Sequence, residues 1–197
     1  MFVQQPNSNV DQTLFLKWIN KHRDGGPTAY GERREYHLFN EEERVHFFTK
    51  ILCNPTYGDF GKISAGQVKC FHNFFKVINR SIGVIESSQK KILVKDFAKL
   101  HGLDTLRHIA VESENDRSRE DSMNLLVDLH LKFDSQITPP EVQAKIWQDF
   151  IDHCMSELES PKDNVVSNNI TLLSKFLDRY EGKKTQKTEM KQQYNQF

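Results

Sequence analysis

Three cysteines and eight histidines are the residues of this chain that could support enzyme chemistry. A cysteine hydrolase needs a thiolate nucleophile, a histidine base within reach and an orienting Asn or Asp. Cys70 precedes Phe71 in an aromatic stripe, Cys154 follows His153 on an amphipathic segment, and Cys53 ends another such segment. Because thiols buried on apolar faces are inert, we expect no catalytic residue here.

Metal and cofactor sites are not indicated by the sequence. It contains no C-x-x-C and no H-E-x-x-H motif, and Asp149 with His153 supplies only two of the four ligands of a structural zinc. Gly58 and Gly61 do not form the G-x-G-x-x-G fingerprint of nucleotide-binding proteins, and no strand pattern precedes them. We therefore expect neither a metal nor a cofactor.

Two charged or glycine-rich segments are candidates for binding a protein partner. Residues 112–121 (ESENDRSRED) carry no large apolar side chain, so we expect a solvated turn between two helices, and residues 25–34 form a loop with two adjacent glycines. Loops between the helices of repeat proteins often bind partners. The candidate partner-binding residues are Arg33, Arg34, Glu112, Arg117 and Arg119. Plain solvated connections remain the alternative for both segments.

Amphipathic helices would position these loops, because apolar residues recur at three- and four-residue steps along most of the chain. Helices are predicted at 11–22, 40–54, 64–78, 88–100, 102–111, 122–133, 138–158 and 168–181. The N-caps predicted for four of them are Asn40, Ser64, Asp104 and Thr138. The segment 91–94 (KILV) also fits a short strand, but no convincing strand pairing is visible.

The pair of helices within 102–133 organises the prediction of the fold. Neither helix can bury its apolar stripe alone, and hairpins of this kind bury a continuous core only by stacking. The sequence therefore predicts an all-α fold, specifically an α-α superhelix of armadillo/HEAT-like helical hairpins. We expect this helical region to cover residues 11–182, between a disordered N-terminus at 1–10 and a disordered polar tail at 183–197.

Composition excludes several classes of function. The 27 basic and 27 acidic residues cancel, whereas nucleic-acid-binding proteins usually show a basic excess. No apolar run approaches the roughly 18 residues of a membrane span, and the first residues lack the apolar core of a signal peptide. We expect protein partners, with no nucleic acid and no membrane, and a cytoplasmic location.

The order of motifs resembles the non-catalytic, armadillo-like region of the giant ubiquitin-specific proteases of the fat facets type. The similar segments are GLDTLRHIAV at 102–111, MNLLVDLH at 123–130, IWQDFIDHCMSEL at 146–158 and NNITLLSKFLDRYEG at 168–182. That family tends to have Trp where this chain has Arg107. The resemblance covers about residues 12–182 and implies a scaffold whose parent enzyme removes ubiquitin by a cysteine mechanism. The catalytic boxes of the family lie in a separate domain, and nothing here resembles them.

The resemblance implies that the chain is a fragment or short isoform that positions partners or ubiquitinated substrates for a catalytic domain. The partner would be a ubiquitinated protein or the remainder of a larger chain. An unrelated stand-alone helical interaction module is the main alternative, and a small cysteine hydrolase is a weaker one. A segment cut from a longer array should expose apolar end faces, whereas a stand-alone module should have polar ends.

Overall fold

The computed structural model describes residues 40–54, 59–87, 92–134 and 136–194. The predicted segments 1–10, 11–22 and 25–34 lie outside the described residues. The helices are α2 (Glu41–Phe47), which continues as a π-helical turn (Phe48–Leu52), α3 (Ala65–Ser81), α4 (Leu103–Glu112), α5 (Asp116–Leu131), α6 (Pro140–Ser156) and α7 (Asp163–Tyr194). Two 3₁₀ turns are present at Phe97–Lys99 and Glu157–Glu159, and the strands are β1 (Ile85–Ser87) and β2 (Ile92–Val94).

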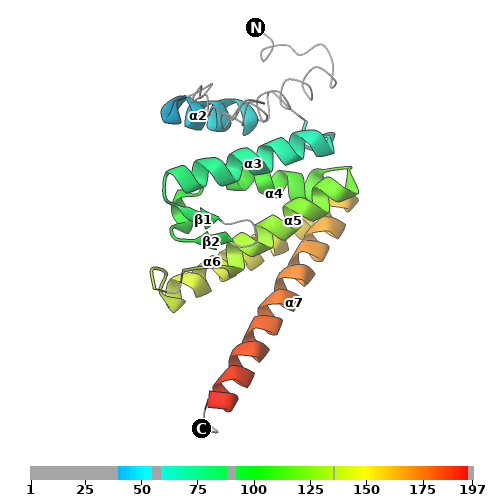
Figure 1. The fold of residues 1–197 in the computed structure, drawn as a ribbon. Coiled ribbons are helices and arrows are strands. Elements are labelled where there is room, and N and C mark those ends of the chain that lie inside the picture. Colours follow the sequence, from blue (N-terminus) through cyan, green and yellow to red (C-terminus); the bar gives the residue numbers. More distant parts are fainter. Residues whose placement is uncertain (1–39, 55–58, 88–91, 135, 195–197) are drawn as a thin grey trace, which may run out of the picture.

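The fold is mostly helical, which confirms the coarse prediction of the fold class. In Figure 1, α2 lies along α3, α4 and α5 form an antiparallel pair beneath it, and α7 crosses this pair and then runs away from the rest of the molecule. The helices pack around one apolar core that every helix from α2 to α7 enters. This arrangement fixes the turn between α4 and α5 at the surface.

The first two described helices begin as the sequence predicts. The Asn40 side chain accepts a hydrogen bond from the Glu43 amide while the Glu43 carboxylate accepts one from the Asn40 amide, both at 2.8 Å. Ser64 and Gln67 form the same capping box at the start of α3. These reciprocal bonds satisfy amides that a helix leaves unpaired at its N-terminus. The predicted aromatic stripe of α3 is buried in the core, at Phe71, Phe74, Phe75 and Ile78.

A short β-hairpin replaces the predicted helix at 88–100, and the prediction that no strands pair is wrong. β1 and β2 run antiparallel, with Ile85 opposite Val94 and Ser87 opposite Ile92. Ile92 and Val94 are buried while Leu93 between them is half-buried, which is the alternation of a strand. Phe97 then lies in a 3₁₀ turn. The alternative reading of KILV as a strand is therefore the correct one.

Backbone hydrogen bonds outside the hairpin join β2 to the end of α5. The Val94 amide donates to the Lys132 carbonyl at 2.7 Å, and the Asp134 amide donates to the Val94 carbonyl at 2.9 Å. These two bonds hold the beginning and the end of the segment that contains α4 and α5 next to each other. Strand β2 can make these bonds because its edge away from β1 pairs with no other strand of the two-stranded sheet.

Helix α4 begins at a glycine rather than at the predicted N-cap Asp104. Gly102 has φ +81°, in the left-handed region that favours glycine. A Cβ at this position would lie 2.6 Å from Cζ of Phe48, so the backbone at Gly102 packs directly against that ring. The Asp104 carboxylate is 90% exposed and faces the Arg107 guanidinium at 3.4 Å.

Helices α6 and α7 form a second antiparallel hairpin. Pro139 is the N-cap of α6, one residue beyond the predicted Thr138. Helical periodicity predicts that Phe150 and Cys154 of α6 and Leu172 and Phe176 of α7 face inward, and all four are buried. It predicts the same for Val142 and Leu177, which are instead exposed at 45% and 40%.

The C-terminal helix is longer than the sequence predicts. Its predicted end is Gly182, but α7 continues to Tyr194. A Cβ at Gly182 would meet nothing within 4 Å, which means that no close approach requires a glycine there. Helix propensity alone penalises a mid-helix glycine by only about 1 kcal/mol relative to alanine, too little to end a helix. The division of the chain into 1–10, 11–182 and 183–197 otherwise stays a prediction.

Candidate protein-interaction surface

The charged segment 112–121 is mostly helical, which corrects the prediction of a ten-residue turn. Helix α4 ends at Glu112 and α5 begins at Asp116, so only three residues connect them. Asn115 is the N-cap of α5, and its side-chain oxygen accepts from the Ser118 amide at 2.9 Å. Ser118 and Ser122 are both buried, so this turn of α5 packs inward with serines rather than with apolar side chains. We call the region from Glu112 to Asp121 the α4–α5 corner.

The three described candidate residues at this corner have different roles. Arg117 is the exposed one, with 86% of its side chain accessible and its Nε 4.0 Å from Asp121. Arg119 is 25% exposed; its Nη1 donates to the Ser113 carbonyl at 2.9 Å and it pairs with Asp116. Arg119 therefore fixes the turn, and Arg117 extends from it toward solvent.

Glu112 joins the corner to its neighbours. Its carboxylate lies 3.7 Å from the Lys162 ammonium, just before α7, and 3.9 Å from Nδ1 of His108. The other two candidates, Arg33 and Arg34, lie outside the described residues. The structure thus brings Glu112, Arg117 and Arg119 together at one corner and leaves the remaining two untested.

Two further hydrogen bonds hold the corner against distant parts of the chain. The Glu114 amide donates to the Gly61 carbonyl, and the Asn168 side chain donates to the Val111 carbonyl, both at 2.7 Å. Three segments far apart in the sequence therefore meet here: the loop near Gly61, the corner itself and the first turns of α7. The sequence did not predict that these segments pack together, because each of the two hydrogen bonds uses a backbone group, which every residue type has.

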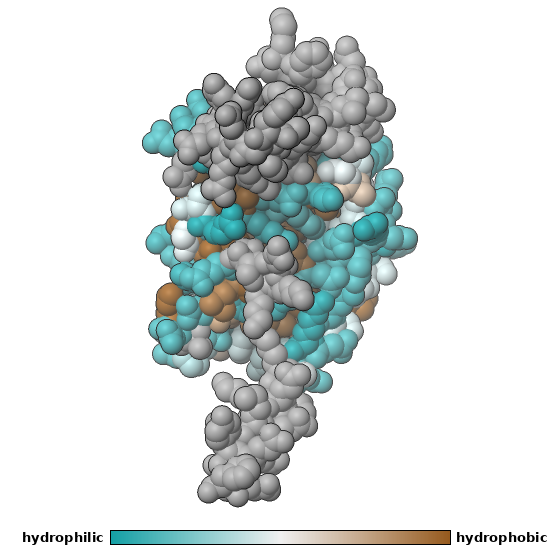
Figure 2. Space-filling model, viewed as in Figure 1, coloured by the Kyte–Doolittle hydropathy of each residue, from teal (hydrophilic) through white to brown (hydrophobic). Residues whose placement is uncertain are grey.

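Exposed charges of both signs lie on the corner and on the two segments that contact it. The exposed side chains are Asp59, Lys62, Asp116, Arg117, Asp121 and Lys162. In the view of Figure 2 the face along α5 is predominantly hydrophilic. Isolated surface ion pairs contribute little to stability, so these charges are available to pair with a partner at low cost. A mixed-charge surface suits a protein better than nucleic acid, which selects basic surfaces.

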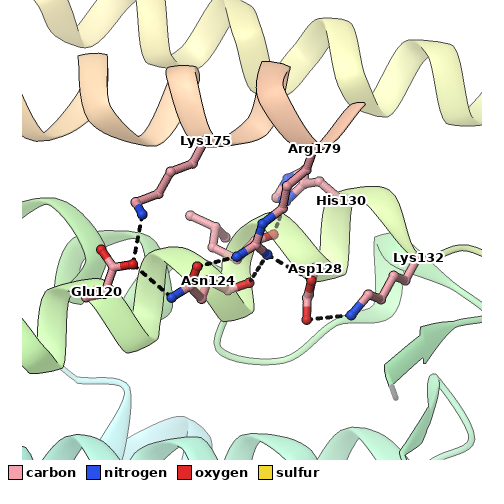
Figure 3. A network of polar contacts seen from close by, with 8 residues as sticks. Glu120, Asn124, Asp128, His130, Lys132, Lys175 and Arg179 are labelled. Atoms are coloured by element: carbon pink, nitrogen blue, oxygen red, sulfur yellow. Dashed lines mark hydrogen bonds and ion pairs between the residues drawn. The ribbon is translucent and has the colours of Figure 1, made fainter. Parts of the chain in front are cut away.

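A polar network fixes α7 to the side of α5 that leads away from the corner (Figure 3). Lys175 pairs with Glu120 at 2.8 Å, and Arg179 pairs with Asp128 at 3.0 Å and also donates to the Asn124 side chain. The hydrogen bond from Lys175 is the main cause that lowers the pKa of Glu120. These contacts orient α7 and offer no group for catalysis, since each charge already has its partner.

The cysteines do not have the properties of nucleophiles. Burial raises the pKa of Cys53 and of Cys154 to about 11, and Cys70 is 2% exposed. These are all the cysteines of the chain. A nucleophilic cysteine needs a lowered pKa, so the structure opposes the cysteine-hydrolase alternative. His153, next to Cys154 in sequence, is half-buried, and its pKa is lowered mainly by burial.

Two other histidines are packed in the protein as neutral rings. Burial lowers the pKa of His72 to about 4 and that of His130 to about 3. His72 bonds to the Ser122 hydroxyl at 3.0 Å, and the ring of His130 lies 4.3 Å from that of Phe150. Within the residues that the structure describes, no three His, Cys, Asp or Glu side chains gather as a metal site. No helix among them is long and apolar enough to span a membrane.

Comparison with known proteins finds a distant similarity. No family model matches the chain. Ubiquitin carboxyl-terminal hydrolase 9Y of Mus musculus is 27% identical over 139 aligned residues, a match that covers 60% of this chain and 5% of that protein. The chain thus spans only a small part of the relative that it matches. The conclusion from sequence and structure together is that this mostly helical chain is distantly similar to a short region of a ubiquitin carboxyl-terminal hydrolase.

Proposed function

We propose that the chain is a non-catalytic helical scaffold segment related to the arm of a large ubiquitin-specific protease. In this role it positions ubiquitinated substrates or other protein partners for a catalytic domain outside this chain. The similarity to part of a ubiquitin carboxyl-terminal hydrolase carries the proposal. The raised pKa values of Cys53 and Cys154 support its non-catalytic character.

The arrangement of hairpins supports the armadillo/HEAT part of the proposal. The α4–α5 pair packs against the α6–α7 pair, with Asn168 and Arg179 of α7 bonded to α4 and α5 respectively. Two stacked helical hairpins that share a core are the unit from which such arrays are built. The β-hairpin between α3 and α4 is an insertion relative to that pattern. A cytoplasmic location, where ubiquitin conjugates occur, belongs to the same proposal.

The α4–α5 corner is the contact surface that we propose for the partner. Its backbone is fixed by Arg119, by the bond to Gly61 and by the bond from Asn168, so the exposed Arg117 extends from a rigid base. A pre-ordered surface binds more tightly than a flexible one because less conformational entropy is lost on binding.

The first test is for catalysis. The purified chain is incubated with ubiquitin that carries a cysteine-reactive group at its C-terminus and, separately, with a fluorogenic ubiquitin substrate. We expect no adduct and no turnover. Turnover together with an adduct at one of the three cysteines would refute the non-catalytic role.

The second test is for partner binding at the corner. With a labelled tetra-ubiquitin chain as the probe, Arg117→Glu should weaken binding at least about tenfold, because it reverses the charge of an exposed anchor. Lys145→Glu, an equal charge reversal at an exposed position on α6, is the matched control and should leave the affinity unchanged. If Arg117→Glu binds tetra-ubiquitin as tightly as the wild type does, the corner is not the binding surface. If the wild-type chain does not bind it, the chain does not recognise ubiquitin.

A further inference from the structure

The outer edge of the α6–α7 hairpin exposes apolar side chains that the fold does not use. Met155, Ile170 and Leu177 are 51%, 55% and 40% exposed. Ile151 and Leu173 beside them are partly buried and pack against the core. We call these five residues the outer strip.

The register of the hairpin places the two halves of the outer strip opposite each other. The rings of Phe150 and Phe176 lie 4.8 Å apart, and those of Trp147 and Tyr180 lie 5.0 Å apart. Because α6 and α7 are antiparallel, a residue five positions after Phe150 lies near one about five or six positions before Phe176. Met155 and Ile170 therefore lie at about the same level of the hairpin, so the strip includes residues of both helices.

The spacing along α7 fits the recognition of another helix. Ile170, Leu173 and Leu177 follow three- and four-residue steps, which form one apolar line along a helix. Ile170 and Leu177 are about 10 Å apart along the axis, or two turns. An amphipathic helix laid along such a line makes contacts at its own positions i, i+3, i+4 and i+7.

Acidic side chains border the strip. On α6, Asp152 is three residues before Met155, which makes it a neighbour on the helical surface. Glu159 ends the 3₁₀ turn that follows α6, four residues after Met155. On α7, Glu181 is four residues after Leu177, and Asp163 lies on the same side near the N-terminus of the helix. All four are exposed.

The described basic side chains near α7 turn away from the strip. Lys175 and Arg179 pair with α5, and Lys162 faces Glu112 of α4. The border of the strip on α7 consists of Asp163 and Glu181 at its ends, with serines between them. An apolar line with an acidic border is complementary to an apolar line with a basic border.

We propose that the outer strip binds an amphipathic helix of a separate partner protein, one whose apolar side is bordered by Lys or Arg. The strip lies on the α6–α7 hairpin and the corner lies on the α4–α5 turn, so this inference does not depend on the proposed function. It assigns the protein a second binding surface with a different chemistry.

The test uses two fluorescein-labelled peptides of 18 residues with the same apolar line of leucines. One has lysines along both sides of the line and the other has glutamates. Fluorescence anisotropy with the full chain should show the lysine peptide binding at least about tenfold more tightly, and its affinity should fall as the salt concentration rises. Equal binding of the two peptides, or no binding of either, would overturn the proposal.

Variants locate the site. Ile170→Ser combined with Leu177→Ser should weaken binding of the lysine peptide at least about tenfold, because it removes the exposed centre of the apolar line. Val142→Ser, at a similarly exposed apolar position at the start of α6, is the matched control and should bind like the wild type. Asp152→Lys with Glu181→Lys should reverse the preference between the peptides.

Two further measurements identify other occupants of the strip. If the wild type is a dimer in sedimentation equilibrium and the double serine variant is a monomer, a second copy covers the strip and the proposal fails. If the double serine variant has a markedly lower melting temperature and the wild type does not bind the lysine peptide, the strip is covered within the chain and the proposal also fails. An unchanged melting temperature with loss of peptide binding supports it.

Discussion

Replacing Gly102 by alanine should destabilise the protein through two separable effects. The first is backbone strain, because φ is +81° and a non-glycine residue in the left-handed region costs about 1–2 kcal/mol. The second is a clash, because the new Cβ would lie 2.6 Å from Cζ and 2.8 Å from Cε1 of Phe48. Overpacking of a core costs about 1–3 kcal/mol, so the free energy of unfolding should fall by about 2–5 kcal/mol in total.

The ring of Phe48 cannot move aside to relieve this clash. It is fully buried, its centroid lies 5.4 Å from that of Phe71, and it meets the edge of Phe75 at 6.4 Å. The Cys53 sulfur, at 3.2 Å from the added Cβ, limits movement of the backbone in another direction. The second effect should therefore persist after relaxation.

Gly83 provides a matched control for the strain alone. Its φ is +75°, yet a Cβ there would meet nothing within 4 Å. Gly83→Ala should therefore cost only about 1–2 kcal/mol. Urea unfolding followed by circular dichroism, with linear extrapolation, would measure both variants. Equal losses within about 0.5 kcal/mol would refute the role that we assign to the contact with Phe48.

A double-mutant cycle would test the same contact in another way. Phe48→Leu removes the ring atoms that the Gly102→Ala Cβ would meet, although it also leaves a cavity. If the clash is real, the double variant should lose at least about 1 kcal/mol less than the sum of the single losses. If the two losses are additive, backbone strain alone explains the destabilisation by Gly102→Ala, and the clash with Phe48 does not contribute.

Three further predictions concern groups that are buried or partly buried. Asn79→Ala should lower the free energy of unfolding by about 3 kcal/mol, because the backbone amide and carbonyl of His101 lose the hydrogen bonds that they make with the Asn79 side chain at 2.8 and 3.0 Å. Asn164→Ala, at an exposed position, is the control and should change the free energy of unfolding by less than about 0.5 kcal/mol in the same urea assay. Burial lowers the pKa of His72 from 6.5 to about 4, so the unfolded chain takes up this proton first as the pH falls. The stability present above pH 6.5 should decline between pH 6.5 and 4; His72 contributes up to about 3 kcal/mol of this decline, and His130, whose pKa is lowered to about 3, contributes as well. His72→Gln should therefore make the curve of urea midpoint against pH less steep in this range without flattening it. Burial raises the pKa of Cys53 to about 11 from 9.0, so iodoacetamide at pH 8 should alkylate it roughly a hundredfold more slowly than an ordinary thiol, and mass spectrometry should show the rate restored in urea.

Two of the four predicted N-caps, Asn40 and Ser64, and the aromatic stripe of α3 were predictable from the sequence because local rules decide them. The capping boxes at Asn40 and Ser64 require only residues three positions apart. The stripe of phenylalanines on α3 follows from helical periodicity. In these places the local pattern and the final packing agree.

The corrected elements are those in which packing overrides the local pattern. The strands have three residues each, too few for a period of two to stand out from helical periodicity. The first turns of α5 bury Ser118 and Ser122, which a search for apolar stripes cannot find. Helix α4 begins at Gly102 because the glycine packs against Phe48, a contact between residues more than 50 positions apart.

The sequence predicted a candidate surface at 112–121, and binding of a partner there stays a prediction. The charge pattern of 112–121 identified the corner, and the sequence could not distinguish the exposed Arg117 from Arg119, which bonds to a backbone carbonyl. The outer strip was not predicted, because Leu177 was assigned to the inner face of α7 and Met155 to neither face. Helical periodicity predicts which side of a helix faces the core, but not how far around the helix the buried surface extends.

The two hydrogen bonds of Val94 make the segment from β2 to the end of α5 a closed loop of about 40 residues. Breaking the two Val94 bonds alone releases little chain entropy as long as the helices inside the loop stay packed. These bonds and the helices α4 and α5 should therefore unfold together. The amide protons of Val94 and Asp134 should then exchange with solvent at the rate of global unfolding rather than by local fraying. The α4–α5 hairpin would in that case be a cooperative unit whose boundary is set by a single residue of a three-residue strand.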